Sequence, residues 1–414
     1  MGDSLPSMAE GAPDHVVLVA NARMPSERAQ SIQIAHAARG FVRAGARTTL
    51  LHARRRGTPT TDAPALYRAL AAGEVDDREL PELVAAPCID AIDLVPRALQ
   101  FTPARIQEWT FGRSAAALVR DRYRDALVLA RDVEVAARLA GRPGVAWEAH
   151  RVPGGRHRRV LSQRFAAAGG AAVAISGGVR DDLAEVGFAA SRVLVEHDAH
   201  DPGLAAAIPA RDAARAALGL DPSRPVVAYC GSLLAWKGVD VLVDAARLPV
   251  LDGVQVLVVG GMAADVARLR EYARGADGVR VDGFQSATVV AQALGAADAT
   301  VVPNRRTPRI SSHYTSPLKL FEAFGAGVPV VASDLPSLRE AAGDGAALFV
   351  EPEDAGALAA GLRRVLDDAA LRESLVAAGR ARAAGATWDA RAARILDFLR
   401  AERARSADGA AHAG

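Results

Sequence analysis

Only two lysines occur in a chain that has 48 arginines, and both stand where a strand-like run gives way to a helical segment. Lys319 lies in SPLKLFE at 316–322, and Lys237 lies in GSLLAWKG at 231–238. A lysine offers a compact ammonium group that the planar guanidinium of arginine does not reproduce. The start of a helix has free backbone N–H groups and a positive potential, so a nearby ammonium group suits a phosphate. Both segments therefore predict anion-binding chemistry.

The first of these segments also carries a carboxylate. Ser316 and Pro317 suit the N-cap and the first position of a helix, which we expect to run to about Phe324. The positive charge of Lys319 would then be unfavourable beside the positive end of the helix dipole, and a bound anion would offset this cost. Glu322 lies on the same side of that helix, where it could accept hydrogen bonds from sugar hydroxyls. The pair indicates a phosphorylated sugar such as a nucleotide, and a solvated helix face with an i,i+3 ion pair is the alternative.

Parallel sheets must position these residues. Short, continuously apolar runs alternate with helical segments, which is typical of a doubly wound α/β fold. The expected strands are 15–20, 46–53, 126–130, 145–150 and 171–176, then 225–231, 254–261, 279–284, 299–304 and 329–334. The rhythm restarts after a loop, short helix and loop at 197–224. We therefore predict Rossmann-like domains at 14–196 and 210–385, followed by a helix at 388–404.

The two lysine segments would meet at one edge of the second sheet. Each follows a strand of that domain, and ligands in open parallel sheets bind at the carboxyl ends of the strands. A nicotinamide site is disfavoured because neither half has the G-x-G-x-x-G fingerprint after a strand. The two lysines are therefore expected to converge on one phosphate-binding cleft.

Composition excludes several classes of protein. The chain has 414 residues and a net charge of +2, which argues against a dedicated nucleic-acid binder. Cys88 and Cys230 lack metal-type spacing, so neither a zinc site nor a disulfide scaffold is expected. The start of the chain lacks the pattern of a secretory signal, and no apolar run reaches membrane-spanning length. We expect a cytoplasmic protein, with Arg54–Arg56 as a weak contact to the inner face of the membrane or simply a solvated surface.

Several motifs together resemble the GT-B, GT4-like family of retaining glycosyltransferases. In the second half they are GSLLAWKG (231–238), VVGG (258–261), VRVDGF (279–284), AADATVVPN (296–304) and SPLKLFEAFGAGVPVVASD (316–334). The first half is similar at 24–45, 147–150 and 175–183. The resemblance implies an α/β GT-B fold in which two Rossmann-like domains face a cleft and the C-terminal helix crosses back to the first domain.

The resemblance also implies roles for particular residues. Lys237 would bind the diphosphate of a nucleotide sugar, Glu322 would bind ribose hydroxyls, and His150 would face the donor sugar or the acceptor. His150 alone could equally be a loop or capping histidine. The implied donor-binding set is Gly231, Ser232, Lys237, Gly283, Phe284, Pro303, Tyr314, Ser316, Pro317, Leu318, Lys319 and Glu322. The implied acceptor side is Pro25, Ser26, Arg28 and Ser31.

Two positions depart from the family pattern. Tyr314 stands where many relatives carry the first of two glutamates, and Ser232 stands where an arginine often accompanies the lysine. Three functions therefore remain open. They are a metal-independent retaining glycosyltransferase acting on a glycan, lipid-linked or small-molecule acceptor, a GT-B enzyme that epimerises or hydrolyses a nucleotide sugar, and a non-catalytic sugar-nucleotide binding protein. No cofactor besides the nucleotide sugar co-substrate is expected.

Overall fold

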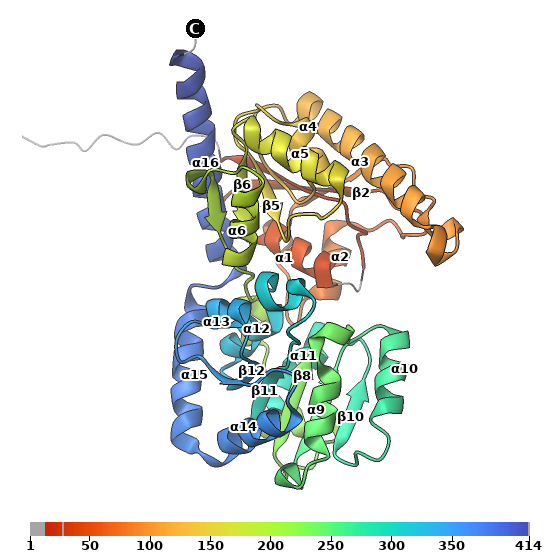
Figure 1. The fold of residues 1–414 in the computed structure, drawn as a ribbon, viewed down its shortest axis with the longest axis vertical. Helices are drawn as coiled ribbons and strands as arrows, with labels where there is room; N and C mark the ends of the chain where they lie inside the picture. The colour runs from red at the N-terminus through yellow and green to blue at the C-terminus, as the bar shows by residue number, and fades with distance from the viewer. Residues whose placement is uncertain (1–12, 27–28, 413–414) are drawn as a thin grey trace, which may run out of the picture.

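The structure is a computed structural model that describes residues 13–26 and 29–412. Two α/β domains are stacked along the long axis of the molecule (Figure 1). Each is built on its own fully parallel sheet, with strand order β3-β2-β1-β4-β5-β6-β7 in the first domain and β10-β9-β8-β11-β12-β13 in the second. Both sheets reverse their strand order beside the first strand, as doubly wound folds do.

The first domain contains seven strands and six α-helices among the described residues. The strands are β1 (His15–Ala20), β2 (Arg47–Ala53), β3 (Glu82–Ala86), β4 (Leu127–Ala130), β5 (Val145–Ala149), β6 (Ala171–Ala174) and β7 (Val193–Val195). The helices are α1 (Ala29–Arg43), α2 (Ala63–Leu70), α3 (Phe101–Arg122), α4 (Val133–Arg138), α5 (Arg156–Ala167) and α6 (Gly177–Glu185). Short 3-10 helices are η1 (Asp77–Glu79), η2 (Ile92–Leu94), η3 (Arg97–Leu99) and η4 (Ala190–Arg192).

The second domain follows the same plan. Its strands are β8 (Val226–Cys230), β9 (Gln255–Val259), β10 (Val279–Asp282), β11 (Ala299–Val302), β12 (Val330–Ser333) and β13 (Ala347–Val350). Its α-helices are α7 (Pro202–Ala206), α8 (Arg211–Leu218), α9 (Val239–Ala246), α10 (Ala263–Tyr272), α11 (Ala287–Ala296), α12 (Leu318–Ala326), α13 (Pro336–Ala342), α14 (Ala355–Asp367) and α15 (Ala369–Ala384). The remaining turns are η5 (Ala235–Lys237), η6 (Pro249–Leu251) and the π-helical η7 (Ile310–Tyr314).

The α/β fold class is confirmed, and the expected strands all form. Three strands were missed: β3, β7 and β13, which are short edge strands. Each has intermediate burial along most of its length, so none gives the continuous apolar signal of a central parallel strand. The segment 197–224 was wrongly expected to hold one short helix, because it contains both α7 and α8.

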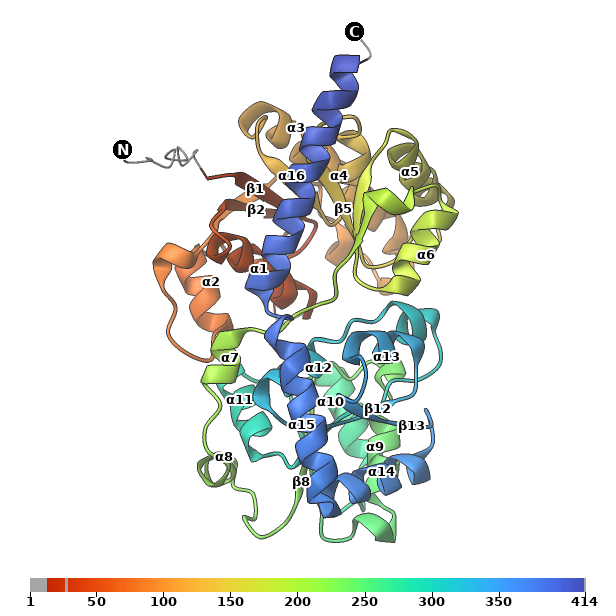
Figure 2. The same ribbon diagram turned by 90° about the vertical axis from the view of Figure 1, so that its left-hand side faces the viewer.

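The last helix returns to the first domain. α16 (Trp388–His412) follows α15 of the second domain and then runs along α1 (Figure 2). The two helices approach closely, because a β-carbon at Gly40 of α1 would lie 2.6 Å from the carbonyl oxygen of Trp388. This confirms the predicted crossing of the C-terminal helix, which here extends beyond 404.

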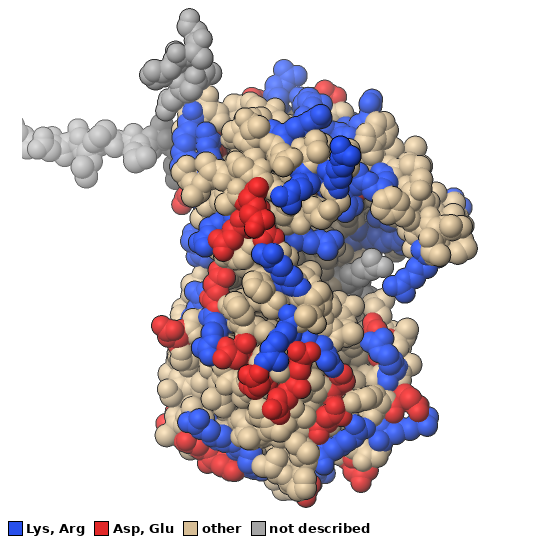
Figure 3. Space-filling view, viewed as in Figure 1, with Lys and Arg blue, Asp and Glu red and all other residues tan. Residues whose placement is uncertain are grey.

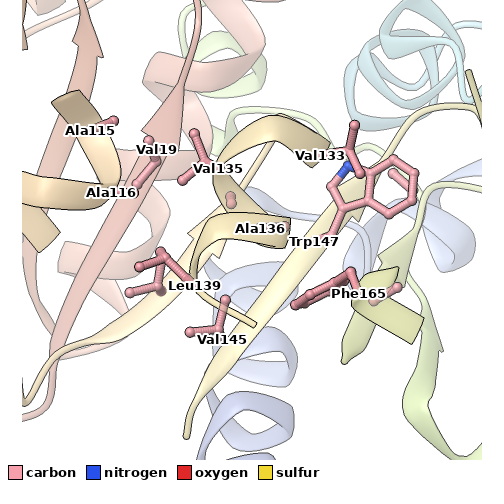
Figure 4. Packing of buried hydrophobic residues seen from close by; sticks show 14 of the residues in the cluster. Val19, Ala115, Ala116, Val133, Val135, Ala136, Leu139, Val145, Trp147 and Phe165 are labelled. Atoms are coloured by element: carbon pink, nitrogen blue, oxygen red, sulfur yellow. The ribbon is translucent and has the colours of Figure 1, made fainter. Parts of the chain in front are cut away.

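Trp147 anchors the end of β5 in the core of the first domain. Its side chain is buried beside Val133 and Phe165, and Phe188 lies 6.1 Å from its ring centroid (Figure 4). Burial of such a large ring fixes the backbone that follows it. Residues 148–150, at the carboxyl end of β5, are thereby held at the face of the domain that meets the second one.

None of the helices described between residues 13 and 412 is long and apolar enough to cross a membrane.

Candidate functional site

The carboxyl ends of four neighbouring strands form one edge of the second sheet. Gly231 follows β8, Gly260 follows β9, Gly283 follows β10 and Pro303 follows β11. The loops touch, since a β-carbon at Gly260 would lie 2.3 Å from the carbonyl oxygen of Gly231. Both glycines also have positive φ, of 118° and 145° respectively. Glycine is thus required for this close backbone approach.

Lys319 lies in the first turn of α12, as predicted, but the helix starts later than expected. α12 begins at Leu318 with Pro317 at the N-cap position and ends at Gly327, which has a φ of 69°. Ser316 is not the N-cap. Its Oγ instead accepts a hydrogen bond of 2.7 Å from the backbone N–H of Asp198, in the segment between the domains. The serine therefore ties the start of α12 to that segment.

The ammonium group of Lys319 is buried without a hydrogen-bond partner in the described part of the chain. It lies 3.6 Å from the ring centroid of Tyr229 in β8, and a β-carbon at Gly231 would come within 2.9 Å of it. Burial, followed by the charge of Lys237, lowers the pKa of Lys319 well below its usual value. A buried cation without a partner is costly. The site is electrostatically incomplete without an anion.

Lys237 ends the short helix η5 after β8. Gly238 has a φ of 65°, and a β-carbon there would lie 2.0 Å from the carbonyl oxygen of Pro303, which packs this loop onto the one after β11. The Lys237 side chain is buried, and its Nζ lies 4.0 Å from the ring centroid of Trp236. Burial lowers the pKa of Lys237 to about 7, against an opposing effect of Asp198. The second lysine thus also lacks a full counter-charge.

Glu322 lies one turn after Lys319. Burial raises the pKa of Glu322 to about 7, although the charge of Lys319 opposes the shift. The i,i+3 ion pair of the alternative interpretation does not form among the described side chains, and Lys319 turns to Tyr229 instead. Both side chains of the predicted pair therefore retain capacity for a ligand.

His150 belongs to a buried network at the end of β5. Its Nε2 lies 2.6 Å from Nη2 of Arg131, which must be the donor, so the proton of the neutral ring is on Nδ1. Burial and then the charge of Arg131 lower the pKa of His150. Arg131 also contacts the fully buried Glu148 at 3.3 Å, and Arg391 of α16 contacts the other carboxylate oxygen at 2.6 Å. The imidazole is thus held neutral and in one orientation.

Asp198 lies between the site residues of the first domain and those of the second. Its buried carboxylate accepts a hydrogen bond from the Gln33 side chain of α1. Its charge acts on His150 from the first domain and on Lys237 from the second. Burial raises the pKa of Asp198 itself. His150 and Lys237, predicted from opposite domains, are therefore brought to the same region.

Tyr314 has a different environment from the one expected. It lies in η7, packs against the core of the first domain and donates a hydrogen bond to Asp182 of α6, which Arg309 also contacts at 2.7 Å. Burial, followed by the hydrogen bond to Asp182, raises the pKa of Tyr314 to about 12. The hydroxyl therefore joins the domains, and any contact of Tyr314 with a donor remains a prediction.

The other predicted donor residues surround the same edge. The Tyr229 hydroxyl donates a hydrogen bond of 2.6 Å to the backbone carbonyl of Ser232, so this contact does not use the Ser232 side chain. Phe284, next to Gly283, is 43% exposed. An exposed aromatic ring beside the strand ends is suited to stacking on a base. Its contact with a nucleotide remains a prediction.

Two pockets lie on the predicted acceptor side. One, of about 260 Å³, is lined by Pro25, Ser26 and neighbours from the first domain together with Met262 of the second. The other, of about 300 Å³, is lined by Ser26, Ser31 and further first-domain residues. The structure thus brings three of the four acceptor-side residues to pockets. The fourth, Arg28, lies outside the described residues.

Sequence reasoning missed several residues of the site. Arg131 and Asp198 follow no recognised motif, and only the burial of their side chains reveals them. Asn304 is fully buried at the end of β11, and neither side-chain amide atom has a partner among the described residues. The sequence signal for Asn304 was its place two residues after a buried strand on the ligand-binding edge. No group of three or more His, Cys, Asp or Glu side chains suited to a metal occurs within 13–26 and 29–412.

Comparison with known proteins identifies a family and curated relatives that match part of the chain. Residues 224–368 match the family described as "Glycosyl transferases group 1". The D-inositol 3-phosphate glycosyltransferase of Jonesia denitrificans is 33% identical over 198 residues, which cover 45% of each chain. The phosphatidyl-myo-inositol mannosyltransferase of Mycobacterium tuberculosis is 36% identical over 167 residues, which cover 39% of this chain and 42% of that protein. The chain thus matches less than half the length of these curated relatives.

Solved structures match over nearly the whole chain. Sucrose-phosphate synthase from Thermosynechococcus elongatus superposes with a TM-score of 0.72 at 20% identity, covering 94% of this chain and 98% of that one. HepE from Anabaena in complex with UDP-glucose superposes with a TM-score of 0.67 at 15% identity, covering 94% and 99%. Identities this low establish the fold alone, and that fold is the predicted GT-B arrangement.

Proposed function

We propose that the chain moves a sugar from a nucleoside diphosphate sugar to an acceptor hydroxyl, because residues 224–368 match the group 1 glycosyltransferase family and the chain has a GT-B fold. The observation that carries the proposal is the pair of buried lysines at the strand ends. Lys319 has no hydrogen-bond partner in the described part of the chain, and both lysines have a lowered pKa caused by burial. A diphosphate supplies the missing negative charge.

The two lysines would act where charge develops during the reaction. As the C1–O bond of the donor breaks, negative charge grows on the departing diphosphate. Lys237, Lys319 and the free N–H groups at the start of α12 stabilise that charge without reorganising, because packing already holds them in place. These basic groups take the part that a metal has in other transferases, so we propose that none is required.

His150 would act on the sugar rather than on the diphosphate. Arg131 occupies Nε2, which leaves the Nδ1–H group as the available donor for a sugar or acceptor hydroxyl. Glu322 would bind the ribose hydroxyls. We further propose retention of the anomeric configuration by same-face attack, because the sequence offers no evident carboxylate nucleophile.

The class of donor follows from the chemistry of the site and from one structural neighbour. HepE of similar fold was solved with UDP-glucose, and the exposed Phe284 beside the strand ends is suited to a base. Curated relatives carry names that specify inositol 3-phosphate or phosphatidyl-myo-inositol. We therefore propose a nucleoside diphosphate hexose as donor and a hydroxyl of a glycan, a lipid-linked sugar or an inositol-type small molecule as acceptor.

A thermal-shift screen of nucleoside diphosphate sugars, followed by product analysis with an acceptor panel, tests the proposal. A donor should raise Tm, because ligand that binds only the folded state stabilises it. Lys237→Ala should retain the fold and lose both the shift and turnover. His150→Ala should lower kcat more than it weakens donor binding. Donor consumed completely without an acceptor would instead identify an epimerase or hydrolase, and binding without any product would identify a binding protein.

A further inference from the structure

Exposed large hydrophobic side chains gather in one segment of the first domain. Eleven such side chains are exposed among the described residues, and six of them lie between residues 89 and 109. We call these six the apolar patch: Ile89, Leu94, Leu99, Phe101, Ile106 and Trp109. Phe101 is 78% exposed and Leu99 is 65% exposed. A concentration of this kind marks an interaction surface, whereas single exposed hydrophobics are ordinary.

Helix packing and hydrogen bonds hold the backbone of the apolar patch in place. η2 and η3 pack against the start of α3, which forms a projecting corner of the first domain (Figure 1). The backbone N–H of Ile89 donates to Thr110 of α3 at 3.0 Å, and the Gln100 side chain donates to the carbonyl of Val95 at 3.3 Å. The apolar side chains are therefore displayed by ordered backbone.

One face of α3 alternates aromatic rings with arginines. Phe101, Arg105, Trp109 and Arg113 recur every four residues, so they follow one stripe of the helix. The guanidinium of Arg113 lies 5.3 Å from the Trp109 ring centroid. The opposite face, which includes Phe111 and Ala115, is buried in the core. α3 therefore presents an amphipathic outer surface of rings and cations.

Every acidic side chain within residues 86–113 is already paired with an arginine. Asp90 binds Arg55 at 2.7 Å, Asp93 binds Arg23, and Glu108 accepts from Arg158 at 2.8 Å. The carboxylates around the patch are thus neutralised by residues of the first domain.

Four nearby arginines have no acidic partner within the residues that the structure describes. They are Arg54, Arg56, Arg97 and Arg113. Arg56 is adjacent to the patch, because its backbone N–H donates to Asp90 at 3.0 Å. The exposed face of the first domain in Figure 3 is likewise rich in basic and poor in acidic side chains around this projecting corner. The rim of the patch is therefore positively charged.

We propose that the apolar patch docks on an anionic phospholipid surface. The aromatic and aliphatic side chains enter the boundary between headgroups and acyl chains, and the four arginines bind lipid phosphates. Both features are needed, because apolar area supplies the insertion and positive charge selects anionic lipid. Unpaired cations beside an apolar surface match the combination of phosphate groups and acyl chains that an anionic bilayer presents.

The patch also adjoins the pocket of about 300 Å³ on the acceptor side. Ile92 and Gln100, from the same segment, line that pocket together with Ser26 and Ser31. A membrane against the patch would bring lipid headgroups to the mouth of the pocket. The acceptor is then a hydroxyl carried by a membrane lipid. This last step rests on the proposed function, whereas docking itself does not.

Vesicle flotation tests the docking. The full chain is mixed with vesicles of phosphatidylcholine alone or of phosphatidylcholine with phosphatidylglycerol, and the floated fraction is measured at low and high salt. We expect binding only to the anionic vesicles. Leu99→Ser with Phe101→Ser should weaken partitioning about tenfold or more. Arg97→Ala and Arg113→Ala should each weaken it about fivefold. Val250→Ser, at a 43% exposed site in the second domain, is the matched control and should change nothing.

Each other outcome overturns the docking proposal. Wild-type protein that stays with the supernatant beside anionic vesicles overturns it, as does flotation that the Leu99/Phe101 double variant leaves unchanged. A wild-type dimer that this variant makes monomeric would show that a second copy covers the patch. The donor-induced Tm shift is measured on the same samples. Wild-type protein that shows the donor-induced Tm shift but does not bind anionic vesicles contradicts docking alone. Wild-type protein that binds these vesicles but shows no donor-induced shift contradicts the proposed function alone.

Discussion

Lys237 of η5 and Lys319 of α12 are 82 residues apart in the chain, yet they face the same region. Burial and, after it, the charge of Lys237 lower the pKa of Lys319. Each ammonium lies against an aromatic ring, Lys237 against Trp236 and Lys319 against Tyr229. Two like charges held together in a buried site store unfavourable energy that an anionic ligand releases.

Lys319→Met should therefore stabilise the unliganded protein and abolish donor binding. The methionine keeps much of the volume against Tyr229 and removes a buried polar group without a partner, a gain of about 1–3 kcal/mol. Chemical denaturation measures the free energy of unfolding, and the donor-induced Tm shift measures binding. Arg363→Met, at an exposed ion pair in α14, is the control and should change stability by less than about 1 kcal/mol. A destabilised Lys319→Met variant would contradict the interpretation that the buried ammonium group of Lys319 destabilises the unliganded protein.

The contribution of this site to stability should have a minimum near pH 7 in the unliganded protein. The pKa of Glu322 is raised from 4.5 to about 7, so its stabilising protonation is lost as pH rises through 7. The pKa of Lys237 is lowered from 10.5 to about 7, so the stability gained by deprotonation at high pH is lost as pH falls through 7.

A double variant isolates that contribution. The free energy of unfolding is measured between pH 5 and 10, a range of about five units around the two shifted pKa values, for the wild type and for Lys237→Met with Glu322→Gln. The difference between the two curves should be largest near pH 7 and should shrink when donor is bound. A difference that does not vary with pH would mean that the two groups titrate normally.

Gly231→Ala should disturb the site through Lys319. A β-carbon at Gly231 would lie 2.9 Å from both Cε and Nζ of that lysine, so the ammonium group must move and donor affinity should fall at least tenfold, about 1.4 kcal/mol. Gly219→Ala is a matched control, since Gly219 also has positive φ but open space around it. Both variants should lose about 1 kcal/mol of stability from backbone strain. Equal donor affinity in the two variants would show that the position of Lys319 is unimportant.

Arg391 should fasten α16 to the first domain. Its side chain is buried, contacts Glu148 at 2.6 Å and donates to the carbonyl of His197 at 2.8 Å. Arg391→Met should destabilise the protein by about 3–5 kcal/mol, because a buried carboxylate loses a partner. Arg394→Met removes a more exposed contact to Glu196 on the same helix and should cost about 1 kcal/mol or less. Similar losses in the two variants would show that Glu148 is adequately paired by Arg131 alone.

Several features of the site followed from local sequence. The central strands are continuous apolar runs, so their positions were predicted, and parallel pairing then put the residues that follow them on one edge. Lys237 and Lys319 could be placed there because each follows such a strand. The edge strands β3, β7 and β13 were not predicted, because partly buried strands carry a weaker pattern.

Local sequence misled at one point and left a second contact unforeseen. Ser316 was predicted to cap α12, since serine before proline is a common helix start. In the structure its hydroxyl is used by the backbone of Asp198. The hydrogen bond from the Tyr314 hydroxyl to Asp182 was not foreseen either, and the predicted contact of Tyr314 with a donor stays a prediction. Neither hydrogen bond could be foreseen, because each joins segments far apart in the chain and sequence spacing says nothing about distant partners.

The sequence by itself determined the fold class, the repeated β–α plan and the residues that end the strands, because these depend on burial patterns over a few neighbouring positions. Only the tertiary structure decided which charges meet. Asp198 acts on both His150 and Lys237, Arg131 orients the imidazole, and Lys319 turns to Tyr229 rather than to Glu322. The physical reason is that a charge is felt through space and is strengthened by burial, so its partners are set by how the two domains pack and not by their order along the chain.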